Sequence, residues 1–352
     1  MSYAETTNPN APVSMVEKWD KTFAESSRVE HRKVSFHNRY GITLVGDLYL
    51  PKNRGQQKLA AIAVSGPFGA VKEQSSGLYA QTMAEQGFVT LAFDPSYTGE
   101  SGGQPRNVAS PDINTEDFSA AVDFLGIQKE VDRNRIGILG ICGWGGMALN
   151  AAAMDTRIKA VATSVMYDMS RAMGHGVGDG KDRYSTADRR AVLQYLNEQR
   201  WKDAESGTFA HGGHDISVDQ NGKVSAAERI LPQTLPASPH PVLKEFFDYY
   251  RVPRGFHERS VNSTGAWTAT MPLSFMNMPL LSYANEITIP TLIVTGENAH
   301  SRYFAEDAYK AVGSKEKELV VVAGANHVDL YDNAAGKIPF ARFEQFFKTS
   351  LQ

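Results

Sequence analysis

The sequence has little that would direct it to a membrane, to nucleic acid or to an oxidising compartment. Its 352 residues include one cysteine, which excludes an intramolecular disulfide. The 36 Lys and Arg residues nearly balance the 39 Asp and Glu residues, so the basic surface typical of nucleic-acid-binding proteins is missing. No apolar run approaches the ~18 residues that a membrane helix needs, and the start of the chain shows no signal-peptide pattern. We therefore expect a cytoplasmic protein with no membrane and no nucleic-acid partner.

Periodicity indicates an α/β protein. Residues 1–29 are polar and predict an N-terminal arm, and a hairpin is predicted at Asn38 to Gly41. From residue 59, short apolar runs alternate with helical patterns, which is typical of a buried parallel sheet built from βαβ units. The predicted strands are 59–64, 88–93, 136–139, 158–165, 289–295 and 318–322, and the predicted helices are 78–86, 116–125, 145–154, 304–312 and 339–349.

The alternation stops between Met166 and about Ile289, where Gly, Pro, His and aromatic residues take over. A structureless loop of this length is improbable inside a compact domain, so residues 167–288 are predicted to be a folded insertion. It would form a cap over the carboxyl edge of the sheet, where open α/β sheets bind ligands. Residues 30–166 and 289–352 would then make up the core.

Cys142 lies in the stretch with the strongest chemical signal. Residues 132–147 predict a strand, a glycine-rich turn and the start of a helix, which is the arrangement of a nucleophile elbow. A helix N-terminus lowers the pKa of a thiol and enriches the nucleophilic thiolate. The backbone N–H of Gly143 would face the developing oxyanion. In the loop after the 59–64 strand, Pro67 has no N–H, so Phe68 is the candidate for the second donor.

These motifs together resemble the α/β-hydrolase superfamily, and within it the dienelactone-hydrolase-like branch, which carries cysteine in an elbow of the form G-x-C-x-G-G. The segment from Phe93-Asp94 to Gly99-Glu-Ser101 is similar to the loop after the superfamily's fourth strand. The segment Val322-Ala-Gly-Ala-Asn-His327 is similar to the loop that carries its catalytic histidine. The resemblance implies an α/β-hydrolase fold, with a mostly parallel central sheet, helices on both faces and an inserted cap. It also implies a hydrolase that needs no cofactor and no metal, with His327 as the general base.

The chain departs from the family's pattern near the nucleophile and in the acid loop. Trp144 stands where a small residue is usual, so a second register, with Trp144 at the nucleophile position, stays open beside the one that uses Cys142. Ala299 stands where the family commonly has an acid. Glu297 is the first candidate to orient the imidazole, and Asp168 is the second.

The oxyanion loop and the cap each hold one further ambiguity. Dienelactone hydrolases carry a glutamate in the oxyanion loop, and the first carboxylate here is Glu73. In the cap, Ser217 to Glu228 matches the calcium loop of an EF-hand except for serine in place of the first aspartate. The flanks of this segment favour a hairpin at Asn221-Gly222, and calcium binding stays an open question.

The predicted reaction is hydrolysis of an ester, thioester or lactone of small to medium size. His327 would deprotonate Cys142, and Trp144 together with Trp267 of the cap would contact the substrate. The expected partner is a small-molecule substrate, and base rates favour a homodimer. One alternative is a catalytically silent protein of the same fold that binds a ligand or a protein partner. Another is different chemistry on the same scaffold, such as C–C bond hydrolysis.

Overall fold

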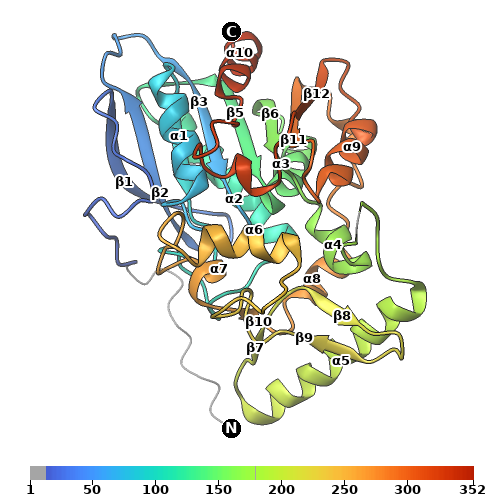
Figure 1. Cartoon of the computed structure of the whole chain (residues 1–352). Coiled ribbons are helices and arrows are strands. Elements are labelled where there is room, and N and C mark those ends of the chain that lie inside the picture. The colour runs from blue at the N-terminus through green and yellow to red at the C-terminus, as the bar shows by residue number, and fades with distance from the viewer. Residues whose placement is uncertain (1–12, 179) are drawn as a thin grey trace.

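The computed structural model describes residues 13–178 and 180–352, and an eight-stranded sheet forms the centre of this described part (Figure 1). The strand order is β1-β2-β4-β3-β5-β6-β11-β12. β2 pairs antiparallel with β1 and β4, whereas the other neighbours are parallel. The mostly parallel sheet predicted from the sequence is therefore confirmed. Its strands are β1 (Val29–His37), β2 (Thr43–Pro51), β3 (Leu59–Ser65), β4 (Val89–Phe93), β5 (Val131–Ile141), β6 (Ile158–Ser164), β11 (Thr291–Gly296) and β12 (Lys317–Val322).

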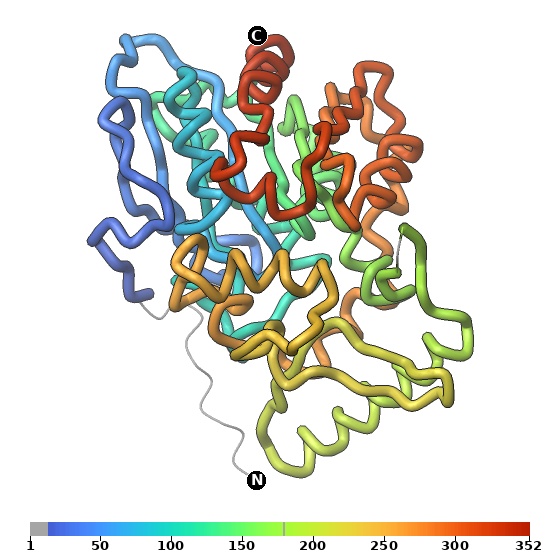
Figure 2. The backbone as a smooth tube through the Cα atoms, viewed as in Figure 1, coloured from blue at the N-terminus to red at the C-terminus, as the bar shows by residue number. Residues whose placement is uncertain are grey.

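Helices cover both faces of this sheet. α1 (Ser75–Glu85) and α10 (Phe340–Ser350) contact each other on one face. α2 (Pro111–Gly126) and α3 (Gly143–Met154) contact each other on the opposite face, and α9 (Arg302–Ala311) packs on β11 and β12. Figure 2 shows the β1-β2 hairpin, in blue, at one edge and the orange and red C-terminal part at the other. Because both faces are covered, β3, β4 and β11 are almost wholly buried and are rich in apolar residues.

One strand extends well beyond its predicted bounds. β5 begins at Val131, five residues before the predicted start, and Asp132 to Arg135 form its polar first half. These residues are largely exposed because this part of β5 reaches past the buried centre of the sheet. The apolar pattern used for the prediction therefore begins only at Ile136.

The segment between β6 and β11 folds into a 21-residue helix, α5, and several shorter elements that gather at one end of the sheet, at the bottom of Figure 1. The region that resembled a calcium loop is a hairpin of β8 and β9, with Gly222 in the left-handed region at φ 76°. The Asp219 carboxylate accepts the backbone N–H groups of Asn221 and Lys223, at 2.8 and 2.9 Å. The elements are α4 (Met169–His175), α5 (Thr186–Ser206), β7 (His211–Gly212), β8 (Ile216–Val218), β9 (Val224–Ala226), α6 (Pro241–Tyr250), α7 (Val261–Thr264), β10 (Trp267–Thr268), α8 (Pro272–Met276) and η1 (Ala284–Glu286).

The predicted N-terminal arm is only partly covered, since residues 1–12 lie outside the described residues. Its later part packs on the core, where the Thr22 N–H donates to the Glu73 carbonyl at 2.9 Å. Within 13–178 and 180–352, no helix has the length and apolar character needed to cross a membrane. The same residues include no cluster of three or more His, Cys, Asp or Glu side chains suited to a metal ion.

Candidate active site

Cys142 sits on a sharp turn between β5 and α3. Its φ of 57° and ψ of −128° are unusual for a residue with a side chain, and such strain persists only where the surroundings enforce it. Hydrogen bonds fix the turn, because the Cys142 N–H donates to Ser164 and its carbonyl accepts from Gly145 and Tyr167, each at 2.9 Å. Strand and helix nearly touch here, since a Cβ on Gly140 would lie 2.1 Å from the Trp144 carbonyl oxygen. The thiol is thereby held at the carboxyl end of the central strand.

The two residues that the sequence offers for the nucleophile position, Cys142 and Trp144, lie in different surroundings. Trp144 is 1% exposed and lies in the core, where its ring meets Phe93 and Phe118 edge to face, with centroids 5.7 and 5.4 Å away. Cys142 therefore occupies the elbow, and Trp144 points into the protein beneath it. This position corrects the expectation that Trp144 contacts the substrate. The physical reason is that Trp144 lies in the first turn of α3, where its ring packs between Phe93 of β4 and Phe118 of α2.

Two backbone N–H groups lie beside the sulfur. Burial raises the pKa of the Cys142 thiol, while the Tyr331 hydroxyl and the N–H groups of Phe68 and Gly143 act in the opposite direction. A Cβ on Gly143 would come within 2.8 Å of the Phe68 Cβ, so the two donors are close neighbours. The geometry thus brings together the three groups that the sequence suggested for nucleophile and oxyanion hole.

The loop that carries Phe68 is held by the segment before and within α7. The Asn262 Nδ2 donates to the Phe68 carbonyl at 2.7 Å, and the Ser260 hydroxyl donates to the Gly69 carbonyl at 2.9 Å. Trp267 packs against the Phe68 ring with centroids 4.6 Å apart and is 2% exposed. Trp267 is not among the residues that line the cavity, so it supports Phe68 from behind, whereas the sequence suggested direct substrate contact.

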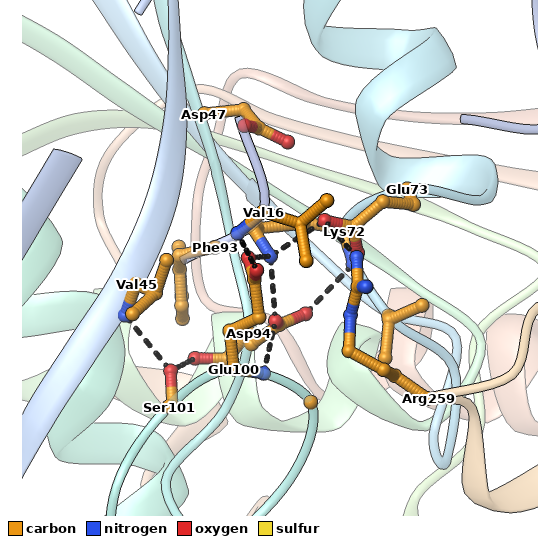
Figure 3. A network of polar contacts seen from close by, with 12 residues as sticks. Val16, Val45, Asp47, Lys72, Glu73, Phe93, Asp94, Glu100, Ser101 and Arg259 are labelled. Carbon is orange, nitrogen blue, oxygen red and sulfur yellow. Dashed lines mark hydrogen bonds and ion pairs between the residues drawn. The ribbon is translucent and has the colours of Figure 1, made fainter. Parts of the chain in front are cut away.

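A buried ion network around Lys72 and Glu73 anchors the chain just after this loop (Figure 3). The Lys72 ammonium is fully buried and lies 2.7 Å from both Glu73 and Asp94 and 2.6 Å from Glu100. Burial opposes its charge, but Asp94 and the other carboxylates hold the pKa of Lys72 well above its usual range. Arg259 adds a bond to Glu73 at 3.0 Å and so ties the loop to the inserted segment. Glu73, the first carboxylate after Phe68, is therefore occupied by ion pairs.

The two ring nitrogens of His327 are bonded to hydroxyl groups and not to the Cys142 sulfur. Its Nε2 is 2.9 Å from the Tyr331 hydroxyl, and its Nδ1 is 2.6 Å from the Ser301 hydroxyl. The Tyr331 hydroxyl in turn lowers the pKa of the Cys142 thiol, and both residues line the same cavity. Burial, reinforced by His300, lowers the pKa of His327 well below its usual range, so the imidazole is neutral at rest.

The two acids suggested by the sequence lie elsewhere. Glu297 is exposed, and its Oε2 accepts the Gly324 N–H at 2.8 Å. Asp168 is the N-cap of α4 and accepts the Arg171 N–H at 3.0 Å. Among the described residues, no carboxylate hydrogen-bonds the His327 Nδ1, and Ser301 takes that place. The expectation that Glu297 or Asp168 hydrogen-bonds this nitrogen is therefore corrected. The reason is that Glu297 follows the end of β11 and its side chain turns outward, whereas Ser301, just before α9, turns inward.

Sequence reasoning missed both Ser301 and Tyr331. Ser301 directly precedes α9, and a serine at that position is typical of an ordinary helix N-cap. Its side chain makes no capping hydrogen bond and instead bonds the His327 Nδ1. Tyr331 follows His327 by four residues, and the short 3-10 helix η2 (Val328–Leu330) between them brings the two side chains together. That spacing of four is the one signal that could have indicated the contact.

A cavity of about 1070 Å³ opens above the thiol. Its wall near Cys142 is apolar and aromatic and comes from α4 and α6, with Met169, Met173 and Phe246 among the lining residues. His300 also faces the cavity, with its Nε2 on the Tyr167 hydroxyl, and burial lowers its pKa to about 4. The arrangement places a thiol, two backbone N–H groups and neutral imidazoles beside a space large enough for a medium-sized organic molecule.

Comparison with known proteins shows relatives along nearly the whole chain. The uncharacterized protein PA2218 of Pseudomonas aeruginosa is 58% identical over 349 residues, which is 99% of this chain and 88% of that protein. Its crystal structure covers 97% of this chain and 100% of its own, with a TM-score of 0.88 and 59% identity. The uncharacterized protein YcjY of Escherichia coli is 33% identical over 308 residues, covering 87% of this chain and 94% of that protein.

Further matches are more distant or shorter. The α/β hydrolase GrgF from a Penicillium species covers 92% of this chain and 99% of its own with a TM-score of 0.70, and at 19% identity it shows the fold alone. The thiohydrolase aneE of Aspergillus aculeatus is 34% identical over 142 residues, or 40% of this chain and 41% of that protein. A family model described as PET hydrolase-like matches residues 4–192, more than half of the chain. With this match and the α/β-hydrolase fold, the chain belongs to the PET hydrolase-like family and is a hydrolase.

Proposed function

We propose that this protein hydrolyses esters, thioesters or lactones of small to medium size through the thiol of Cys142. The observation that carries the proposal is the meeting of the thiol with the N–H groups of Phe68 and Gly143 at the floor of the cavity. Donors in this position stabilise the negative charge that develops on a carbonyl oxygen during nucleophilic attack. A strained elbow supports the same reading, because it presents the side chain above the sheet.

The reaction proceeds through an acyl-enzyme. The Cys142 sulfur attacks the carbonyl carbon while its proton passes to His327, and the oxyanion is held by Phe68 and Gly143. Collapse of the intermediate breaks the bond to the alcohol or thiol, which leaves with the proton from His327. Water then attacks the Cys142 thioester, gives its proton to His327, and releases the carboxylic acid and the free thiol.

The cavity supports a substrate with an apolar acyl group. Met169, Met173 and Phe246 form the wall near the thiol, and methionine side chains adapt to irregular shapes. The partial match to a protein named as a thiohydrolase supports the inclusion of thioesters. The volume of about 1070 Å³ supports acyl groups well beyond acetyl.

The test is a comparison of wild type, Cys142→Ser and Cys142→Ala on p-nitrophenyl acetate and butyrate, with intact mass recorded during turnover. Wild type is expected to hydrolyse both and to carry a transient acyl adduct. Cys142→Ala is expected to lose adduct and turnover together while its melting temperature stays near that of wild type. Hydrolysis by Cys142→Ala at the wild-type rate refutes the proposal.

A second candidate is a binding protein of the same fold that does not turn its ligand over. Two observations favour it: burial raises the pKa of the Cys142 thiol, and the His327 Nδ1 faces Ser301 and not a carboxylate. In that case wild type and Cys142→Ala show equal background rates. A ligand from a screen of acids and esters would then raise the melting temperature without being consumed.

A further inference from the structure

We propose that Tyr331 is a catalytic residue that carries the proton between the Cys142 sulfur and the His327 Nε2. This inference rests on the proposed function, because it assigns the base path for the Cys142 nucleophile. The phenol oxygen is 2.9 Å from Nε2, the phenol lines the same cavity as Cys142, and its hydroxyl lowers the pKa of the thiol, which places it beside the sulfur. His327 therefore reaches the sulfur through Tyr331.

The surroundings leave the phenol as the path for this proton. Cys142 is 6% exposed, and His327 and Tyr331 are 0% exposed. Phe246 packs against both rings, with its centroid 5.5 Å from that of His327 and 6.3 Å from that of Tyr331. His327 is not among the residues that line the cavity, whereas Cys142 and Tyr331 are, so a proton from the cavity reaches Nε2 through the phenol.

The proposed relay is a two-proton shift. In it the resting thiol donates to the Tyr331 oxygen, the Tyr331 hydroxyl donates to the His327 Nε2 at 2.9 Å, and the Nδ1–H donates to the Ser301 hydroxyl at 2.6 Å. When the sulfur attacks, the S–H bond breaks as its proton joins the phenol oxygen, and the phenol's own proton moves to Nε2. The products are a sulfur bonded to carbon, a neutral tyrosine and an imidazolium. The reverse shift delivers the proton to the leaving group, so Tyr331 ends each step unchanged.

The neighbouring titratable groups do not offer a shorter route. His300 is 4.8 Å from His327 between ring centroids, and its Nε2 is bonded to the Tyr167 hydroxyl. Tyr250 lies 6.0 Å from Tyr331 between ring centroids. Tyr331 is therefore the one of these phenols that bridges the thiol and His327.

The experiment is a double-mutant cycle of Tyr331→Phe and His327→Gln, read as kcat/KM on p-nitrophenyl butyrate from pH 5 to pH 10. Phenylalanine keeps the ring and removes only the hydroxyl. A relay predicts that each single variant loses about 10²–10⁴-fold, the usual size of general acid–base catalysis, and that the double variant loses no more than either. The pH dependence that His327 imposes on wild type should vanish in Tyr331→Phe.

Tyr49→Phe is the matched control. Tyr49 is also 0% exposed, its hydroxyl makes no hydrogen bond in the described part of the chain, and it does not line the cavity. It should keep wild-type kcat/KM, which separates loss of a buried phenol from loss of the relay. Melting temperatures of all variants show whether each is folded, and a Tyr331→Phe variant that is folded and fully active overturns the proposal.

Two other outcomes also overturn the relay. Losses that multiply in the double variant mean that Tyr331 acts independently of His327, for example as an oxyanion donor. Loss of stability with an unchanged pH profile means a structural role. Failure of the proposed function is distinguishable, because there Cys142→Ala keeps its activity and no acyl adduct forms in any variant.

Discussion

The partner of the His327 Nδ1 gives the sharpest test of the site's geometry. The Ser301 hydroxyl lies 2.6 Å from Nδ1, and both residues are 0% exposed. In Ser301→Ala, Nδ1–H stays buried without an acceptor while the imidazole becomes charged in the transition state. A hydrogen bond to a charged group contributes about 1.5–3 kcal/mol, so kcat/KM should fall about 10- to 150-fold.

Glu297→Gln is expected to have almost no effect. Glu297 is exposed and bonds the Gly324 N–H, so the substitution should change kcat/KM less than about twofold and the free energy of unfolding by about 0.5 kcal/mol or less. Ser301 makes no side-chain cap bond to α9, so the loss in Ser301→Ala reflects its contact with His327 and not a frayed helix.

The assay is initial rates on p-nitrophenyl butyrate at several pH values, beside chemical denaturation of each variant. Ser314→Ala is the matched control, since Ser314 is also buried but its hydroxyl accepts the Glu316 N–H outside the site. The reasoning is refuted if Glu297→Gln loses activity while Ser301→Ala keeps it. That result would mean that a carboxylate orients the imidazole during turnover.

Three further outcomes follow from the same structure. Gly143→Ala should lower kcat about 10²–10³-fold, because the new Cβ would lie 2.8 Å from the Phe68 Cβ and disturb both oxyanion donors, whereas intact kcat would rule out this site for the oxyanion. Trp144→Ala should lower the free energy of unfolding by about 3–5 kcal/mol in urea denaturation, since Trp144 fills the core, and an unchanged stability would contradict that placement. Burial, with a contribution from Asp329, raises the pKa of Glu245 to about 7, so the folded state holds this proton longer than the unfolded chain does. The stability that the protonated Glu245 contributes is present below its ordinary pKa of 4.5 and is lost as pH rises through about 7. Glu245→Gln should therefore raise the free energy of unfolding by about 1–3 kcal/mol at pH 8, a range reduced for the partial exposure of the side chain, and leave it unchanged at pH 4. Equal stability of the two proteins at pH 8 would contradict this sign.

The strand and helix pattern was predictable because it depends on local periodicity. β3, β4 and β11 are buried on both faces, so their apolar runs stand out in the sequence. The bounds of α3 and α10 differ from prediction by two residues or fewer, whereas β5 starts five residues early because its first half is polar. Local pattern therefore determines which elements exist and fails where a strand leaves the core.

Part of the candidate site was also predictable, because it depends on residues that are neighbours in the sequence. Cys142 and Gly143 are adjacent in the chain, and the turn between β5 and α3 needs small residues at fixed positions, so the elbow can be recognised from sequence. Phe68 was predicted as the second N–H donor because Pro67, the residue before it, has no N–H. These predictions depend on backbone geometry over a few residues, which a sequence motif encodes directly.

Tertiary structure alone decided the rest of the site. Which side chain faces the His327 Nδ1 depends on how α9 packs on β11, and that packing turns Ser301 inward and leaves Glu297 in solvent. Trp144 became a core residue because α3 lies against the sheet, although the sequence placed it beside the nucleophile. The sequence by itself determined the order of strands and helices and the elbow that carries Cys142. The partners of the histidine come from segments brought together only by folding, because hydrogen bonds across such distances leave no periodic trace in the chain.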